Sequence, residues 1–192
     1  SRGAFTGNVA LAPGTRLLSD GPVQRLQTAN AGLVTLPFSG ASPDLSSLPT
    51  INGTITLAND STVSGFNINP LAANDGVAGP AVGILTNALV DGNVIRGGNR
   101  GVGLDDVGGD VVVRNNIISG SAASGISLGV QTSTGANLDV SGNTITSPGQ
   151  NGIELLVNTL AGAGSSVRAA VTGNTIGAAG NNGIAIQNDA AS

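Results

Sequence analysis

The sequence predicts an all-β solenoid, a fold in which one chain winds into a stack of similar coils. Three observations predict it: a two-part motif returns four times, glycine and asparagine hold fixed places within it, and its apolar positions carry small aliphatic residues. Self-similarity at a period of roughly 20–50 residues is the signature of solenoids and related repeat folds. The copies are Val90–Ile95 with Gly101–Leu104, Val113–Ile118 with Gly125–Leu128, Val140–Ile145 with Gly152–Leu155, and Val171–Ile176 with Gly183–Ile186.

The first part of the chain is less regular. Leu33–Leu36 and Ile51–Leu57 have the apolar pattern of strands, and both are expected to belong to early coils. Between them, residues 37–49 have the proline, glycine and serine content of an extended loop. We therefore expect an irregular N-terminal coil or cap over residues 1–56 and regular repeats over residues 57–192, continuing in the natural protein.

The first half of the motif, Val-x-Gly-Asn-x-Ile, predicts a strand that contains a corner. A looser copy, Val63–Ile68, precedes the other four. The two apolar ends are five residues apart, and residues at an odd separation on a flat strand face opposite sides. Both ends can face the interior only if the chain bends between them. Glycine and asparagine tolerate the left-handed backbone conformation that such a corner needs.

The second half, Gly-Ile-x-Leu, predicts a short strand that is entered through a glycine turn and points its Ile and Leu inward. From leading valine to leading valine, the repeats are 27, 23, 27 and 31 residues long, starting at Val63. Such strands are expected to pair in parallel with their equivalents in the next coil, about 4.8 Å away. With one coil per repeat, the prediction is a single-stranded parallel β-helix of about six to seven coils.

One asparagine holds the same place in every full copy of the motif. An inward asparagine at a bend can bond its amide to the neighbouring coil and so satisfy buried backbone at the corner. The four side chains are therefore expected to stack as a structural ladder rather than to bind a ligand. They are Asn93, Asn116, Asn143 and Asn174.

These motifs resemble the repeats of the right-handed parallel β-helix family of bacterial secreted and surface proteins. The Gly-Asn-x-Ile and Gly-Ile-x-Leu pairs carry the resemblance over about residues 57–188. The family includes polysaccharide lyases, pectin-degrading hydrolases and the passenger regions of autotransporter-like adhesins. The resemblance implies a right-handed coil and an extracellular or cell-surface location. Many functions share this fold, so it does not select one of them.

The composition excludes several classes of partner and of catalytic chemistry from the expectation. Seven arginines, no lysine and a net charge of −4 leave no run of cations for a phosphate backbone, which excludes nucleic acid as the expected partner. No apolar run approaches the ~18 residues of a membrane span, so no membrane insertion is expected. Without cysteine, histidine, lysine or tyrosine, the chain has no thiolate metal site and no conventional base for a nucleophilic serine except a carboxylate.

The densest group of acidic residues is Asp105, Asp106 and Asp110. Carboxylates this close in sequence are candidates for a Ca²⁺ site or for the acid and base of glycoside cleavage. Gly-Leu-Asp-Asp, over residues 103–106, also resembles the paired-Asp motif of pectin-hydrolysing β-helix enzymes. The other parts of that motif set, a histidine and a lysine, are absent. We therefore expect no catalytic residues and no cofactor, with these three aspartates as the alternative.

Recognition, if the chain has any, is expected on the loops that vary in length, because binding residues favour loops on a rigid scaffold. The alternative is that these loops are solvated spacers. The loops are Asn69–Pro80, Asp105–Asp110, Val130–Asn137 and Asn158–Ser166.

The function expected from these features is a non-enzymatic, rod-like structural or adhesive domain of a secreted or cell-surface bacterial protein. Its expected partners are a carbohydrate, a host or neighbouring-cell surface protein, and adjacent coils or domains of the same protein. Two alternatives remain open at this stage: a carbohydrate-active lyase or hydrolase that uses the aspartates, and a module that associates end to end through its exposed sheet edges.

Overall fold

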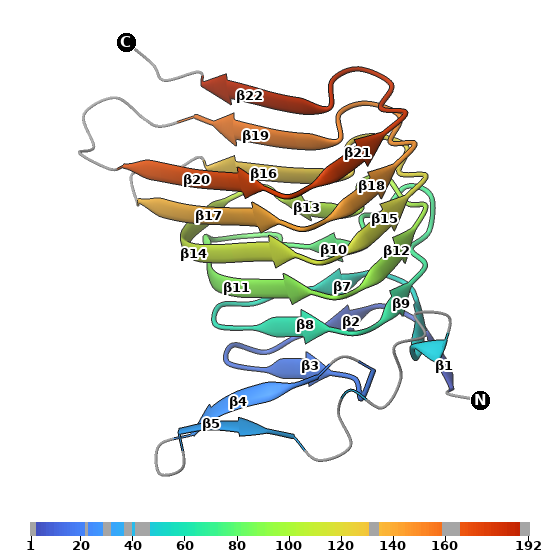
Figure 1. The fold of residues 1–192 in the computed structure, drawn as a ribbon, viewed down its shortest axis with the longest axis vertical. Coiled ribbons are helices and arrows are strands. Elements are labelled where there is room, and N and C mark those ends of the chain that lie inside the picture. The colour runs from blue at the N-terminus through green and yellow to red at the C-terminus, as the bar shows by residue number, and fades with distance from the viewer. Residues whose placement is uncertain are drawn as a thin grey trace.

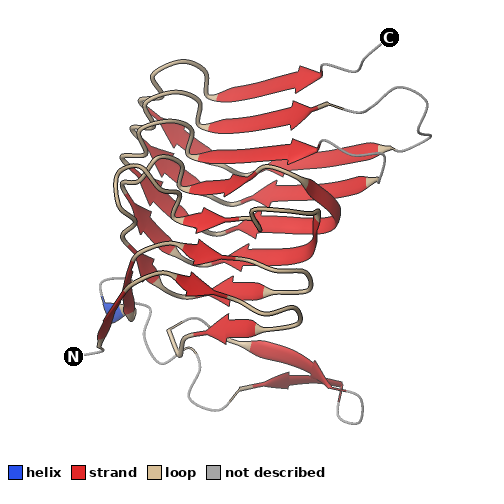
Figure 2. Cartoon of the chain, turned by 180° about the vertical axis from the view of Figure 1, so that it is seen from behind, coloured by secondary structure: helices blue, strands red, loops and turns tan. Residues whose placement is uncertain are grey.

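The chain forms a parallel β-helix with three long sheets along its sides (Figure 1). The computed structural model describes residues 3–21, 23–28, 32–36, 40, 47–130, 135–158 and 166–188. Each turn of the chain contributes successive strands to sheets A, B and C, and every pairing within these sheets is parallel. The view from behind shows the same stack of coils (Figure 2). The predicted all-β, parallel β-helix fold class is confirmed.

Sheets A and B hold seven strands each in the described part of the chain. In spatial order, sheet A contains β1 (Ala4–Thr6), β6 (Thr50–Asn52), β9 (Asn67–Ile68), β12 (Val94–Arg96), β15 (Ile117–Ser119), β18 (Thr144–Thr146) and β21 (Thr175–Gly177). Sheet B contains β2 (Val9–Ala10), β7 (Ile55–Thr56), β10 (Val77–Ala78), β13 (Val102–Leu104), β16 (Ile126–Val130), β19 (Ile153–Val157) and β22 (Ile184–Asn188).

Sheet C holds six strands among the described residues. They are β3 (Arg16–Leu18), β8 (Thr62–Ser64), β11 (Leu85–Asp91), β14 (Val107–Arg114), β17 (Ala136–Ser141) and β20 (Val167–Thr172). The stack is slightly less even than the predicted series of six to seven coils. An insertion at residues 19–49 separates the first coil from the second. After β21 and β22, the described residues contain no further strand of sheet C.

The N-terminal part is more regular than the sequence suggests. Strands β1, β2 and β3 form a complete coil whose strands pair in parallel with β6, β7 and β8. Leu33–Leu36 is the exception, because it does not join a coil. It lies largely in β5 (Gly32–Thr35), which pairs antiparallel with β4 (Arg25–Thr28) as a small separate sheet. Figure 1 shows β4 and β5 at the N-terminal end of the stack, next to β3.

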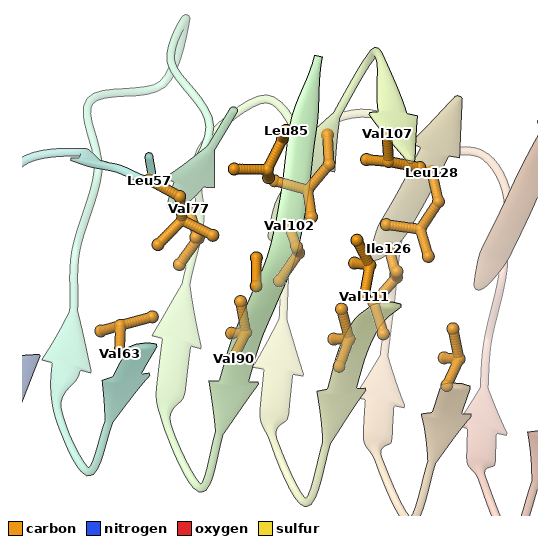
Figure 3. Packing of buried hydrophobic residues seen from close by; sticks show 14 of the residues in the cluster. Leu57, Val63, Val77, Leu85, Val90, Val102, Val107, Val111, Ile126 and Leu128 are labelled. Carbon is orange, nitrogen blue, oxygen red and sulfur yellow. The ribbon is translucent and has the colours of Figure 1, made fainter. Parts of the chain in front are cut away.

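The core lies between the three sheets and consists of aliphatic columns, one residue per coil. Sheet C contributes four fully buried valines at equivalent positions, Val63, Val90, Val113 and Val140. Figure 3 shows part of this core, with side chains from facing strands meeting in the interior. Each fully buried Val, Leu or Ile contributes about 1.5–3 kcal/mol relative to an exposed one. Burial of these side chains in every coil therefore favours stacking.

The corner in Val-x-Gly-Asn-x-Ile lies at its third residue. Gly92, Gly142 and Gly173 have φ near +64°, and Asn115 occupies the same corner with φ +55°. Bends here allow valine and isoleucine, five residues apart, to face the interior together, as expected. Val90 and Ile95 are both fully buried.

The glycine that opens Gly-Ile-x-Leu serves a different purpose from the expected turn. None of Gly101, Gly125 and Gly152 has a positive φ. Each lies where the backbone of the next coil comes close: a Cβ on Gly125 would be 2.5 Å from Ile145 Cγ2 and 2.8 Å from the carbonyl oxygen of Gly152. Space, rather than backbone conformation, therefore requires glycine at this position.

Candidate functional site

The four repeated asparagines form one continuous ladder inside the β-helix. Asn116 is representative and fully buried: its Oδ1 accepts from the backbone N–H of Asn93 at 3.0 Å and from the Asn93 side-chain amide at 3.1 Å. Its own Nδ2 donates to the backbone carbonyl of Val90 at 3.0 Å and to Oδ1 of Asn143 at 3.0 Å. Asn143 and Asn174 repeat the pattern one coil further on.

Asn93, Asn116 and Asn143 use both the oxygen and the nitrogen of their amides within the ladder, which leaves no group free for a ligand. Buried corner groups need hydrogen-bond partners, and the ladder supplies them from one coil to the next. At the start of the ladder, the equivalent position is Phe66, whose backbone N–H donates to Asn93 Oδ1 at 3.1 Å. The geometry therefore assigns the ladder to the scaffold.

Arg100 is the centre of the strongest group of charges on the outside of the β-helix. Its Nη2 donates to Asp75 Oδ2 at 2.7 Å and its Nε donates to Asp75 Oδ1 at 3.1 Å. The two side chains are only 19% and 11% exposed. They lie across Gly103 in sheet B, where a Cβ would collide with both. A bidentate, half-buried pair of this kind holds the loop before β13 in place.

Asp105 completes this group. It accepts from Arg100 Nη1 and, at 2.9 Å, from Arg100 Nη2, but its side chain is 66% exposed. The hydrogen bonds from Arg100 are the main reason why the pKa of the Asp105 carboxyl lies below its usual range. The same hydrogen bonds, opposed by burial, raise the pKa of Arg100. Asp105 is therefore an ionised partner in a salt bridge.

The structure does not bring Asp105, Asp106 and Asp110 together as a metal site. Asp106 lies in the turn between β13 and β14, and its Oδ1 is buried without a hydrogen-bond partner. Asp110 lies on β14 and accepts from the Asn137 side chain of the next coil at 3.0 Å. Across the residues that the structure describes, no three acidic or other metal-ligating side chains form a group that could hold a metal ion.

Sequence reasoning missed a third polar group, on sheet B around Glu154. Glu154 is half-buried and accepts from Ser124 and Ser127 at 3.2 and 3.1 Å and from Asn151 at 2.9 Å. Ser127 is the register partner of Glu154 in the preceding coil. A signal was present, because Ser127 and Glu154 hold the same position in successive Gly-Ile-x-Leu segments.

The structure describes only part of the loops of varying length on which recognition was predicted. Within Asn69–Pro80, Asp75 is committed to Arg100, as described above. Residues 131–134 of the loop Val130–Asn137 and residues 159–165 of the loop Asn158–Ser166 lie outside the described residues, so the predicted recognition there stays a prediction. Among the described residues, no helix is both long and apolar enough to span a membrane.

Comparison with known families gives one match. Residues 51–160 match a family model described as a right-handed beta helix region, which covers more than half of the chain. The matched residues include the three aspartates, the Arg100 group and three of the four ladder asparagines. Searches of curated proteins and of solved structures found no match.

Proposed function

Because the chain belongs to the right-handed β-helix family, we propose that it is a non-enzymatic, rod-like structural or adhesive domain of a secreted or cell-surface bacterial protein. The observation that carries the proposal is the use of the candidate carboxylates. Asp105 is paired with Arg100, and Asp110 accepts from Asn137 of the next coil. A glycosidase needs two carboxylates that flank one bond, about 5–10 Å apart and free to transfer protons.

The repeated positions support the same proposal. The inward aliphatic columns fill the core, the ladder asparagines satisfy the corners, and the opening glycines allow the coils to approach. Seven strands at a spacing of about 4.8 Å give a stack about 30 Å long. Since packing accounts for each repeated residue, the repeat is suited to length and rigidity.

A polysaccharide screen tests the proposal. Purified chain is incubated with neutral and uronic-acid polysaccharides, with and without Ca²⁺, and both new chain ends and retention on the immobilised polymers are measured. We expect no turnover in any condition, with retention on a surface glycan as the sign of an adhesive role. Turnover that disappears in Asp105→Asn or Asp106→Asn, but survives in the matched variant Asp139→Asn, would overturn the proposal in favour of a carbohydrate-active enzyme.

A second candidate function, end-to-end association, is favoured by the apolar C-terminal end of the stack. Ile184 and Ile186 of β22 are 49% and 68% exposed. Beside them, a cavity of about 340 Å³ is lined mainly by aliphatic residues of β17, β19, β20 and β22. Strands β20, β21 and β22 are the last strands of the three sheets in the described part of the chain, and a sheet edge can pair with strands of another copy.

Light scattering over a range of protein concentrations tests this second candidate. We expect the mass of the wild type to rise with concentration and that of Ile186→Lys to stay monomeric. Val82→Lys is the control, because Val82 is 90% exposed in a turn away from this end. A wild type that stays monomeric throughout excludes end-to-end association.

A further inference from the structure

Three of the seven arginines, two near the start of the chain and one in its middle, line a single cavity over the outer face of sheet C. The cavity has a volume of about 240 Å³, and Arg16, Arg25 and Arg114 contribute to its lining. We propose that it binds the oxyanion of a small hydroxylated molecule, a carboxylate, sulfate or phosphate group, with Arg16 and Arg25 as the principal cations. Pockets for drug-sized ligands measure roughly 300–1,000 Å³. This one suits a single sugar acid or a similar fragment.

One wall of the cavity is built by the register of sheet C. Side chains at two outward positions line up across four coils. Arg16 and Leu18 of β3 are the register partners of Thr62 and Ser64 of β8. The series continues through β11 to Arg114 of β14. The parallel stack thus brings together residues almost one hundred positions apart in the sequence. No local motif could have indicated this wall.

The second wall is residues 23–26, which lead into β4. A buried side chain, Gln24, fastens this wall to the β-helix: its amide donates to Ser64 Oγ at 3.1 Å and to the backbone carbonyl of Ser19 at 3.3 Å. The backbone carbonyl of Gln24 also accepts from the N–H of Leu36 at 2.8 Å. Both walls are therefore held in place by hydrogen bonds before any ligand arrives.

Among the described residues, the lining of the cavity carries more positive than negative charge. Arg114 pairs with Asp91 at 3.3 Å, the one carboxylate in the lining. No ion pair within 4.0 Å joins Arg16 or Arg25 to a described residue. The lining therefore carries two more positive than negative charges, within a protein whose net charge is −4. Like charges gathered in a recess repel one another, and an anion relieves that repulsion.

The chemistry of the lining defines the ligand class. A guanidinium presents parallel N–H donors that match the oxygens of a carboxylate, sulfate or phosphate. Thr62 and Ser64 add hydroxyl groups, and Leu18, Leu26 and Leu89 add apolar surface. Hydroxyl groups beside apolar surface fit a small polyol that carries the anion. The cavity lies away from the aspartates discussed above, so the inference does not depend on the proposed structural role.

Calorimetric titration of the whole chain tests the inference. The probes are glucuronate, inorganic sulfate and inorganic phosphate, with glucose as the neutral counterpart of glucuronate. We expect at least one anion to bind at millimolar or lower concentration, glucose not to bind, and the affinity to fall as NaCl increases. Arg16→Gln and Arg25→Gln should each weaken binding at least tenfold. Arg168→Gln, which changes an exposed arginine outside this cavity, should not.

Each result of the titrations either identifies the class of anion that binds or overturns the inference. Binding of glucuronate alone identifies a carboxylate ligand, and binding of sulfate and phosphate alone identifies a tetrahedral anion. Absence of binding by all three anions overturns the inference. An affinity unchanged in Arg16→Gln and Arg25→Gln, or reduced equally in Arg168→Gln, also overturns it, because the anion then binds elsewhere or through net charge. Circular dichroism melts of the three variants verify that each one is folded.

Discussion

At the corners of the core, buried asparagine side chains occupy the interior, whereas aliphatic side chains fill it along the three sheets. A buried amide is tolerated only when its donors and acceptors are all used. In this chain, each ladder asparagine accepts from the preceding coil and donates back to it. The same residue therefore satisfies two coils at once, which explains why it recurs in every full copy of the motif.

Replacing a central ladder residue should be costly. Asn116→Ala leaves the buried N–H of Asn93 and the buried carbonyl of Val90 without their partners. At about 1–3 kcal/mol for each unsatisfied buried group, we expect the free energy of unfolding to fall by about 2–6 kcal/mol in urea titrations. Asn137→Ala is the matched control: Asn137 is exposed, so its loss should cost about 0.5 kcal/mol or less. Equal losses would refute a special role of the ladder.

The salt bridge of Asp105 predicts a dependence of stability on pH. Its pKa is lower in the folded chain than the value of about 3.9 expected when unfolded. The ionised form therefore stabilises the fold fully above that value, and this contribution is lost as the pH falls through the folded pKa. Because the side chain is 66% exposed, water screens the pair and the contribution should stay below about 1 kcal/mol.

Unfolding titrations of wild type and Asp105→Asn at pH 6 and at pH 2.5 measure this contribution. We expect the wild type to be the more stable at pH 6 and the difference to shrink at pH 2.5. Asp139→Asn, on β17, is the control variant for the removal of one carboxylate. A difference between wild type and Asp105→Asn that does not vary with pH would show that the salt bridge contributes nothing.

At the scale of the strand and its turn, close approach between coils explains the glycine that opens the second half of the motif at Gly101, Gly125 and Gly152. The backbone there passes within van der Waals distance of the next coil, so a methyl group has no room. The sequence shows the same residue at each copy but not the reason for it. A turn and a close contact both require glycine, and only the position of the neighbouring coil distinguishes them.

Two alanine variants test this explanation. Gly125→Ala places a Cβ against Ile145 and the Gly152 backbone, whereas Gly183→Ala, at the same motif position in the last coil, meets nothing within 4 Å. Overpacking typically costs about 1–3 kcal/mol, so we expect that loss for Gly125→Ala and little change for Gly183→Ala in thermal or chemical unfolding. If both variants lose the same stability, backbone conformation rather than space is the cause.

At the scale of the whole molecule, each coil contacts only its neighbours, so stability should vary along the stack. The central strand β16 is buried at every residue, whereas β20 and β22 have only partly buried or exposed residues. In such a one-dimensional array, the end units open most easily. We therefore expect amide hydrogen exchange to be slowest in β12–β19 and faster in β1–β3 and β20–β22. Mass spectrometry of peptides from each coil measures this, and uniform protection along the chain would contradict the expectation.

The repetition in the sequence was enough to predict the β-helix, its inward columns and the stacking of Asn93, Asn116, Asn143 and Asn174. These features follow from the spacing of apolar and corner residues within one repeat, which every coil must share in order to stack. The N-terminal part was harder to interpret, because the first coil lacks the motif and Leu33–Leu36 pairs locally with β4 instead of joining a sheet. A short apolar run has the same pattern in either setting.

By itself, then, the sequence determined the fold class and the residues that hold one coil on the next, because both are set by local periodicity. Only the tertiary structure decided which outward side chains meet: Asp75 with Arg100, Glu154 with Ser124 and Ser127, and Arg16 with Arg25 and Arg114 around one cavity. The physical reason is that these contacts join residues of different coils. Their distance in space depends on the stacking register and on an irregular insertion, neither of which leaves a periodic pattern in the sequence.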